Sequence, residues 1–151
     1  PVLQFSFRFV FPNIRYIAQR GSEAYHEIMN SALQNYFGYR FERLCKEALP
    51  YLYKQENVQA RFEVGEFWSK DVQIDIVGLR DDNWVDIGEC KWGTVESVTK
   101  LKEELNQKIS LYPNRKNATV QGRIFVLKKT STHSADRSIR FHSLQDLYEL
   151  S

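Results

Sequence analysis

The sequence has few cysteines and no cysteine motif. Cys45 and Cys90 lie far apart in the chain, without a C-x-x-C pair and without a histidine at ligand spacing. A disulfide framework and the common zinc sites are therefore not indicated. We expect two reduced thiols, with Cys90 as a small packing residue.

Long apolar runs are missing as well. No stretch approaches the roughly 20 apolar residues that cross a bilayer, and the chain does not start with the basic and apolar regions of a signal peptide. We therefore expect no membrane partner and a cytoplasmic location. The first residue is Pro1 and the only methionine is Met29, which predicts a fragment or an excised domain of a longer protein.

A strong excess of charge of one sign is also lacking. The net charge is +2 at pH 7 and the sequence pI is about 8.6. Nucleic-acid-binding domains usually concentrate more basic charge, so composition alone neither requires nor excludes contact with phosphates. The 151 residues, 42% of them hydrophobic, are enough for one ordinary globular domain.

The sequence is rich in aromatic residues in its first third. Apolar and polar residues alternate from Leu3 to Phe11, which formally matches a strand, although a stretch this apolar also suits a buried helix. We expect residues 1–34 to form an aromatic and helical segment that packs on the core. The core domain is expected to comprise residues 35–151.

Helical spacing follows in the next part of the chain. Apolar residues at intervals of three and four predict a helix that Ser22 caps. A second helix is predicted from about Asn35, and Pro50 is expected to bend or end it.

The remainder predicts a mixed sheet. Strands are expected over 61–68, 72–80 and 84–92, joined as an antiparallel meander by turn-like residues. A helix follows from Thr94 or Ser97 to about Leu111, and an apolar run predicts a doubly covered strand over 122–128. A brief strand at 139–141 and a capping box at Ser143 and Asp146 end the chain. This order predicts an α/β (α+β) domain with a mixed central sheet flanked by helices.

On each of two neighbouring predicted strands, an acidic residue lies at the end of a side that is otherwise mostly apolar. Alternation puts Asp75 on the same side of its strand as Gln73 and Val77. Glu89 and Lys91 share a side of the next strand. Because a short turn joins the two strands, we expect Asp75 and Glu89 to converge on one divalent cation, with Lys91 beside them.

This mixture of side chains suits phosphodiester hydrolysis. Carboxylate oxygens of Asp75 and Glu89 would hold Mg²⁺ or Mn²⁺ with several waters, and the ion would neutralise charge on the scissile phosphate. Lys91 would orient the attacking water or stabilise the transition state. The backbone carbonyl of Cys90 is a candidate further metal ligand, and Glu42 of the preceding helix is a candidate carboxylate acting through water.

Three short motifs carry a resemblance to a known superfamily: Glu42, Ile74-Asp75 and Glu89-Cys90-Lys91. Together they resemble the PD-(D/E)XK nucleases, which have the restriction-endonuclease-like fold. The resemblance implies an αβββαβ core, Asp75 and Glu89 as metal ligands, Lys91 as the catalytic lysine and Glu42 as the helix glutamate of many members. Gln107 lies where some members place a polar residue near the site.

A second resemblance covers nearly the whole chain and rests on four longer motifs: residues 7–13, 41–45, 74–77 and 89–92. They resemble the carboxy-terminal domain of archaeal-type P-loop ATPases. The resemblance favours a helix for the first dozen residues and implies an upstream ATPase module in the same longer chain. Because no G-x-x-x-x-G-K-[ST] loop is present, the 151 residues themselves are not expected to bind ATP.

Basic residues near the proposed site predict contacts with backbone phosphates of DNA. They are Arg40, Arg43 and Lys46 on one helix, and Lys128 and Lys129 after the crossover strand. The predicted function is thus a metal-dependent endonuclease domain acting on DNA. The alternative is a catalytically silent module of an ATPase that uses the same fold for DNA or protein docking, and a homodimer is left open in either case.

Overall fold

The computed structural model describes residues 11–128 and 138–149. The chain divides into two compact units, Pro1–Tyr39 and Arg40–Ser151. Residues 3–10 of the first predicted element lie outside the described residues. The predicted packing of residues 1–34 on the core stays a prediction.

Helix α2 (Ile14–Gln55) follows a short 3-10 helix, η2 (Phe11–Asn13). Gly21, at φ 68° and ψ −146°, breaks its helical geometry, a conformation that a residue without a Cβ atom adopts at low cost. No break occurs near Asn35, so the prediction of two separate helices there was wrong. None of the helices in the described part of the chain is long and apolar enough to cross a membrane.

Pro50 was predicted to bend or end the helix, and the prediction of an end was wrong. The helix continues past the proline to Gln55, although a proline removes one hydrogen bond and crowds the preceding turn. Leu52 and Tyr53 of this last part are 4% and 1% exposed and belong to the core beneath the sheet. Their burial keeps the chain helical where the local sequence favours an end.

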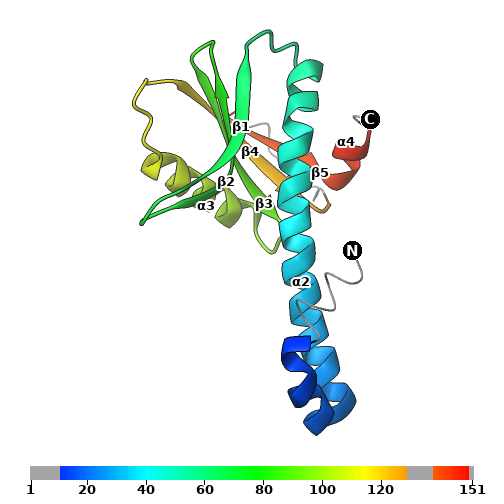
Figure 1. Ribbon diagram of the computed structural model, residues 1–151. Coiled ribbons are helices and arrows are strands. Elements are labelled where there is room, and N and C mark those ends of the chain that lie inside the picture. The colour runs from blue at the N-terminus through cyan, green and yellow to red at the C-terminus, as the bar shows by residue number, and fades with distance from the viewer. Residues whose placement is uncertain (1–10, 129–137, 150–151) are drawn as a thin grey trace. The chain divides into compact units, whose positions relative to one another are not determined.

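The second unit is built on a five-stranded sheet in the order β1-β2-β3-β4-β5 (Figure 1). The strands are β1 (Phe62–Trp68), β2 (Gln73–Arg80), β3 (Trp84–Lys91), β4 (Thr119–Val126) and β5 (Ile139–Ser143). The first three form the predicted antiparallel meander. Helix α3 (Val98–Leu111), capped by Ser97, leads to β4, which is parallel to β3, and β5 is parallel to β4. The predicted mixed sheet flanked by helices is therefore confirmed.

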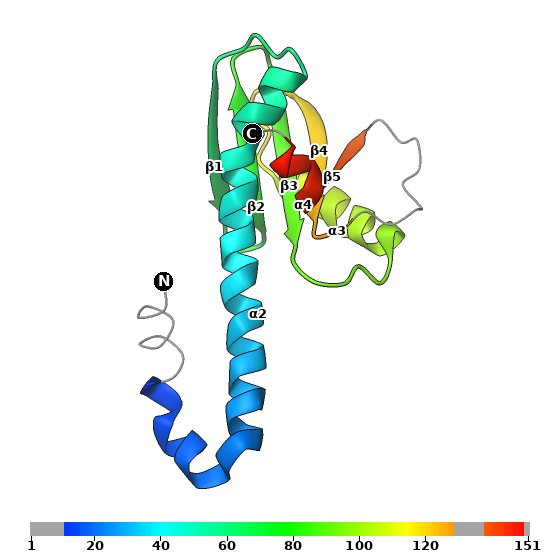
Figure 2. The same cartoon turned by 90° about the vertical axis from the view of Figure 1, so that its right-hand side faces the viewer.

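Helices cover both faces of the sheet (Figure 1, Figure 2). Leu101 and Leu105 of α3 pack on one face, in a core shared with β2, β3 and β4. The last turns of α2 and Leu147 of α4 (Leu144–Tyr148) pack on the other. Residues 121–126 of β4 are all buried, as predicted for a doubly covered strand. The predicted capping box of Ser143 and Asp146 is present at the start of α4.

A buried ionic network joins the end of α2 to β3 and β4. Arg123 Nε donates to Asp86 Oδ1 at 2.5 Å, and its two terminal nitrogens donate to both carboxylate oxygens of Glu56, at 2.8 and 2.7 Å. The Tyr53 hydroxyl donates to the other oxygen of Asp86 at 2.7 Å. Burial alone raises the pKa of Glu56, but hydrogen bonds and charges of Arg123 and Arg140 lower it to about 2. The network therefore holds an ionised carboxylate inside the fold.

Candidate active site

Strands β2 and β3 separate beside Asp75 and Glu89. The last paired residues of the two strands are Ile76 and Gly88, so Asp75 and Glu89 are the first residues beyond the part where these strands pair with each other. Beyond this point a side-chain hydrogen bond links the two strands: Asp75 Oδ2 accepts the backbone N–H of Cys90 at 2.9 Å. The fold thereby anchors one carboxylate directly against the strand that carries the other.

A bulge in β2 directs the Asp75 side chain. Against β1, Gly65 pairs with Val77 and Phe67 pairs with Ile74, so one residue of β1 faces both Asp75 and Ile76. Ile74 and Val77 consequently pack in the same core. The expectation that Asp75 shares a side with Val77 was therefore wrong, because an inserted residue shifts the alternation.

The structure brings three predicted acidic residues within electrostatic reach of one another. Burial, followed by the negative charge of Asp75, raises the pKa of Glu89. The same two causes, in the same order, raise the pKa of Glu42, which α2 contributes. Glu42, Asp75 and Glu89 thus come from three different elements, and the pKa values of Glu42 and Glu89 are both raised in part by the charge of Asp75.

The Glu89 carboxylate is paired with a lysine that sequence reasoning missed. Lys108 Nζ of α3 donates to Glu89 Oε2, and the two side chains are only 25% and 14% exposed. Lys108 comes seven residues after Leu101 and three after Leu105, which are the buried residues of α3. This spacing puts a lysine on the covered face of the helix, a signal that was present in the sequence.

Lys91 and Gln107 do not join this carboxylate cluster. Lys91 is exposed and lines a separate hollow of about 200 Å³ together with Ser97 and Glu104. Gln107 is exposed on α3, where its carbonyl accepts a hydrogen bond from Ser110 Oγ at 2.7 Å. The positively charged side chain beside Glu89 is therefore that of Lys108.

Cys90 presents its thiol to the core behind the site. Its side chain packs against the cluster that contains Cys45. A hydrogen bond to Cys45 and burial raise the pKa of the Cys90 thiol. Both cysteines are free, as expected. Metal ligation by the Cys90 carbonyl stays a prediction.

A cleft of about 520 Å³ opens onto Asp75. It is lined by Glu42, Glu66, Asp75 and the β1–β2 hairpin from Phe67 to Ile74. The cleft thus contains two of the four predicted catalytic residues, and both are acids. Anionic lining of this kind repels a phosphate unless a cation is bound.

The predicted phosphate-binding residues lie at two places. Arg43 and Lys46 are engaged in ion pairs with Glu47 (2.8 Å) and Glu66. Exposed pairs of the Arg43–Glu47 type contribute little, so phosphate can compete for that arginine. The remaining members are Arg40, which is exposed, Lys128, which is exposed just beyond β4, and Lys129, which lies outside the described residues.

The acidic residues fit a hydrated divalent cation better than a metal held by protein alone. Within residues 11–128 and 138–149, no three His, Cys, Asp or Glu side chains form a group that could hold a metal ion. Mg²⁺ usually keeps several waters and needs only one or two carboxylates. Asp75 and Glu89 supply that number. A bound cation would also offset the repulsion from Asp75 that helps to raise the pKa of Glu89.

Comparisons with other proteins place the site inside a shared region. A family model for archaeal and bacterial proteins of unknown function (DUF234) matches residues 6–109. An uncharacterized protein of Methanocaldococcus jannaschii is 31% identical over 113 residues, which cover 72% of this chain and 25% of the relative. The chain therefore spans about a quarter of the length of that relative. No solved structure matches the chain. Glu42, Asp75, Glu89, Lys91 and Lys108 all lie within the region that the family shares.

Proposed function

The chain belongs to the DUF234 family, and from this premise we propose that its unit Arg40–Ser151 is a metal-dependent nuclease domain that hydrolyses DNA phosphodiester bonds. One observation carries the proposal: where β2 and β3 separate, the Asp75 carboxylate accepts the backbone N–H of Cys90, the residue after Glu89. The order α2, β1 to β3, α3 and β4 supports it, because it matches the αβββαβ core of the restriction-endonuclease-like fold.

The residues take distinct roles in this proposal. Asp75 and Glu89 would hold Mg²⁺ or Mn²⁺, with the Cys90 carbonyl as a further ligand. The ion, when bound, supplies charge neutralisation at the scissile phosphate and a more acidic water. The Asp75 carboxylate is held toward β3 by the Cys90 N–H, which fixes the spacing of the acidic pair. Glu42 lies in the same cleft as Asp75 and can accept a hydrogen bond from a water there.

The lysine role has two candidates. The motif assigns it to Lys91, whereas the observed ion pair puts Lys108 beside Glu89. An ammonium group next to the carboxylates can orient a water and stabilise charge on the phosphate. We propose Lys108 for this role in addition to Lys91, since its side chain already reaches the acidic pair.

Cleavage assays test the proposal. Supercoiled plasmid and single-stranded DNA are incubated with Mg²⁺ or Mn²⁺ and the wild type or one of four variants: Asp75→Ala, Lys91→Ala, Lys108→Ala and Asp71→Ala. Asp71→Ala is the matched control, because Asp71 is an acid in the same cleft but lies in the exposed hairpin turn. We expect Asp75→Ala to lose activity about 100-fold or more, the scale for losing one charge-stabilising group. Equal activity of Asp75→Ala and wild type would remove the assignment.

A catalytically silent module is the second candidate function. The specific observation in its favour is the Lys108–Glu89 pair, which already neutralises one of the two carboxylates. In this reading the fold serves DNA or protein docking. Absence of cleavage by the wild type with both metals, together with retained DNA binding, would establish this alternative.

The partners in the whole protein are part of the proposal as well. We propose that the unit is the carboxy-terminal part of an ATPase, supported by the motif resemblance and by the much greater length of the relative. ATP hydrolysis by the full-length protein, with and without DNA, tests this. A cytoplasmic location and a homodimer stay predictions.

A further inference from the structure

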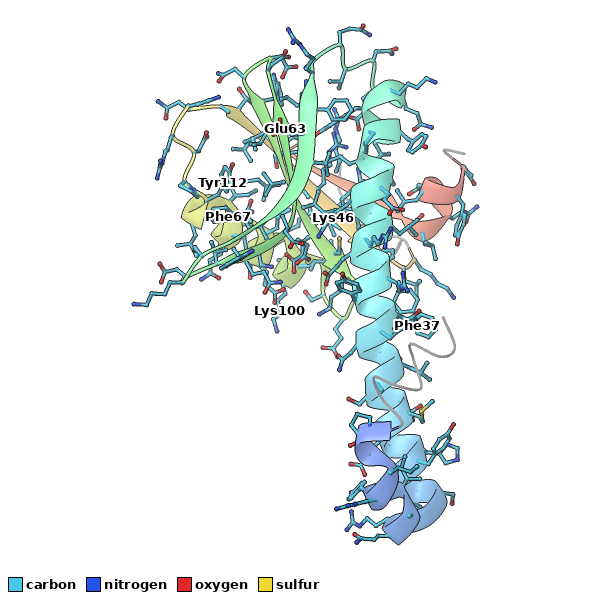
Figure 3. All side chains as sticks on the ribbon, in the orientation of Figure 1. Phe37, Lys46, Glu63, Phe67, Lys100 and Tyr112 are labelled. Carbon is cyan, nitrogen blue, oxygen red and sulfur yellow. The ribbon has the colours of Figure 1, made fainter. Side chains whose placement is uncertain are left out.

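The β1–β2 hairpin presents an exposed indole beside the cleft that contains Asp75. Trp68 is 75% exposed, although it ends a strand whose previous residue is packed. Phe67 faces the core and meets Tyr112 edge to face, with 5.4 Å between ring centroids (Figure 3). Alternation therefore turns Trp68 to the opposite side of the strand.

Two polar side chains accompany Trp68. Gln73 is its cross-strand partner in the register of β1 and β2, and Lys70 lies in the turn between them. All three residues are exposed and line the cleft. Across residues 11–128 and 138–149, neither Trp68 nor Lys70 has a side-chain hydrogen bond, ion pair or ring contact. The three side chains are therefore available to a ligand.

The turn that carries these groups is well fixed. Ser69 Oγ accepts the backbone N–H groups of Asp71 at 3.2 Å and Val72 at 3.3 Å. The Ser69 N–H in turn donates to the Val72 carbonyl at 2.8 Å. These hydrogen bonds restrain the hairpin tip, which lowers the ordering cost of binding.

The three side chains match three features of a nucleotide: the face of the base, the edge of the base and the phosphate. The face of Trp68 can stack on a base, and base–aromatic stacking tolerates any sequence. The Gln73 amide can hydrogen-bond to a base edge, and the Lys70 ammonium can contact a phosphate. Gln73 precedes Asp75 by two residues and lines the same cleft, and two strand residues span about 7 Å. A nucleotide held here would lie next to the phosphate at Asp75.

We propose that Trp68, Gln73 and Lys70 form a stacking subsite for one unpaired base of single-stranded DNA. The base must be unpaired, because a duplex presents base edges in its grooves while the base faces stay stacked inside. The position of the scissile phosphate beside this subsite rests on the proposed nuclease function. The acids Glu42 and Asp75 of the cleft make strand binding depend on a divalent cation.

Fluorescence anisotropy tests the subsite. A labelled oligothymidylate and a duplex of equal length are titrated with protein in Ca²⁺, which binds carboxylates, and in EDTA. Trp68→Ala is expected to weaken single-strand binding roughly 5- to 150-fold, the range for losing one stacked base, and to change duplex affinity less than about 2-fold. Trp68→Phe should keep most of the affinity. Trp84→Ala is the control, since Trp84 is a partly exposed tryptophan at the far end of β3.

Each other outcome counts against the subsite. Wild-type affinity of Trp68→Ala for the single strand overturns it, as does an equal loss in Trp84→Ala or an equal loss of duplex binding. Failure of the wild type to bind either DNA also overturns it and points to protein docking. The nuclease function is judged separately by cleavage in Asp75→Ala. Loss of binding in Trp68→Ala with unchanged cleavage in Asp75→Ala would keep the subsite and reject the nuclease.

Discussion

Replacing Glu56 by glutamine removes a carboxylate that pairs with both Arg123 and Arg140. The pKa of Glu56 falls from an ordinary 4.5 to about 2 in the folded protein. That difference corresponds to about 3 kcal/mol of folding free energy. Because the folded-state pKa is the lower one, this stability is present above pH 4.5 and is lost as the pH falls toward 2. The Glu56 side chain is only 20% exposed, so solvent screening removes little of it.

Urea denaturation measures the effect directly. At pH 7 we expect Glu56→Gln to lower the free energy of unfolding by about 3 kcal/mol, and at pH 3 the gap to wild type should shrink by about 2 kcal/mol. Glu63→Gln is the matched control, because Glu63 is an exposed glutamate of β1, and it should change stability by less than about 0.5 kcal/mol. A Glu56→Gln protein as stable as wild type at pH 7, or a gap that is constant with pH, would refute the reasoning.

Two further predictions concern packing and metal. Gly78→Ala should destabilise the protein by about 1–3 kcal/mol in urea, because its Cβ would lie 2.1 Å from the Tyr53 hydroxyl, whereas Gly65→Ala has open space and should be nearly neutral. Mn²⁺ at about 100 times its dissociation constant should stabilise the wild type by about 2.7 kcal/mol in thermal unfolding, and should leave Asp75→Ala unchanged. Lys108→Ala should need less Mn²⁺ for the same shift, since the competing ammonium is gone; an unchanged Mn²⁺ requirement would contradict this.

Elements that depend on local signals were predictable from the sequence. Strands β2 and β3 begin and end within a residue of their predicted bounds, because turn residues flank an apolar pattern. Ser97 caps α3 with its side chain accepting from Lys100 N, and Ser143 with Asp146 forms a capping box. These contacts join residues three apart, so a short window of sequence contains all the information needed.

Features that depend on distant residues were not predictable in the same way. The helix passes Pro50 because Leu52 and Tyr53 are buried by the sheet, and no local pattern reports that burial. The bulge at Asp75 is visible only in the register with β1. Lys108 could have been noticed on the buried face of α3, but its partner Glu89 follows only from the parallel crossover.

The exposed edge of the sheet has a consequence for self-association. Among residues 11–128 and 138–149, strand β1 pairs on one side only, and an unpaired edge offers its backbone groups to a second chain. Glu63 and Glu66 are exposed on this strand, and the register shift beside Gly65 makes the ladder irregular. Edge-to-edge pairing of two copies would bring these carboxylates together along an uneven ladder. A homodimer of this protein is therefore expected to form through another surface, which leaves the edge beside the cleft open to solvent.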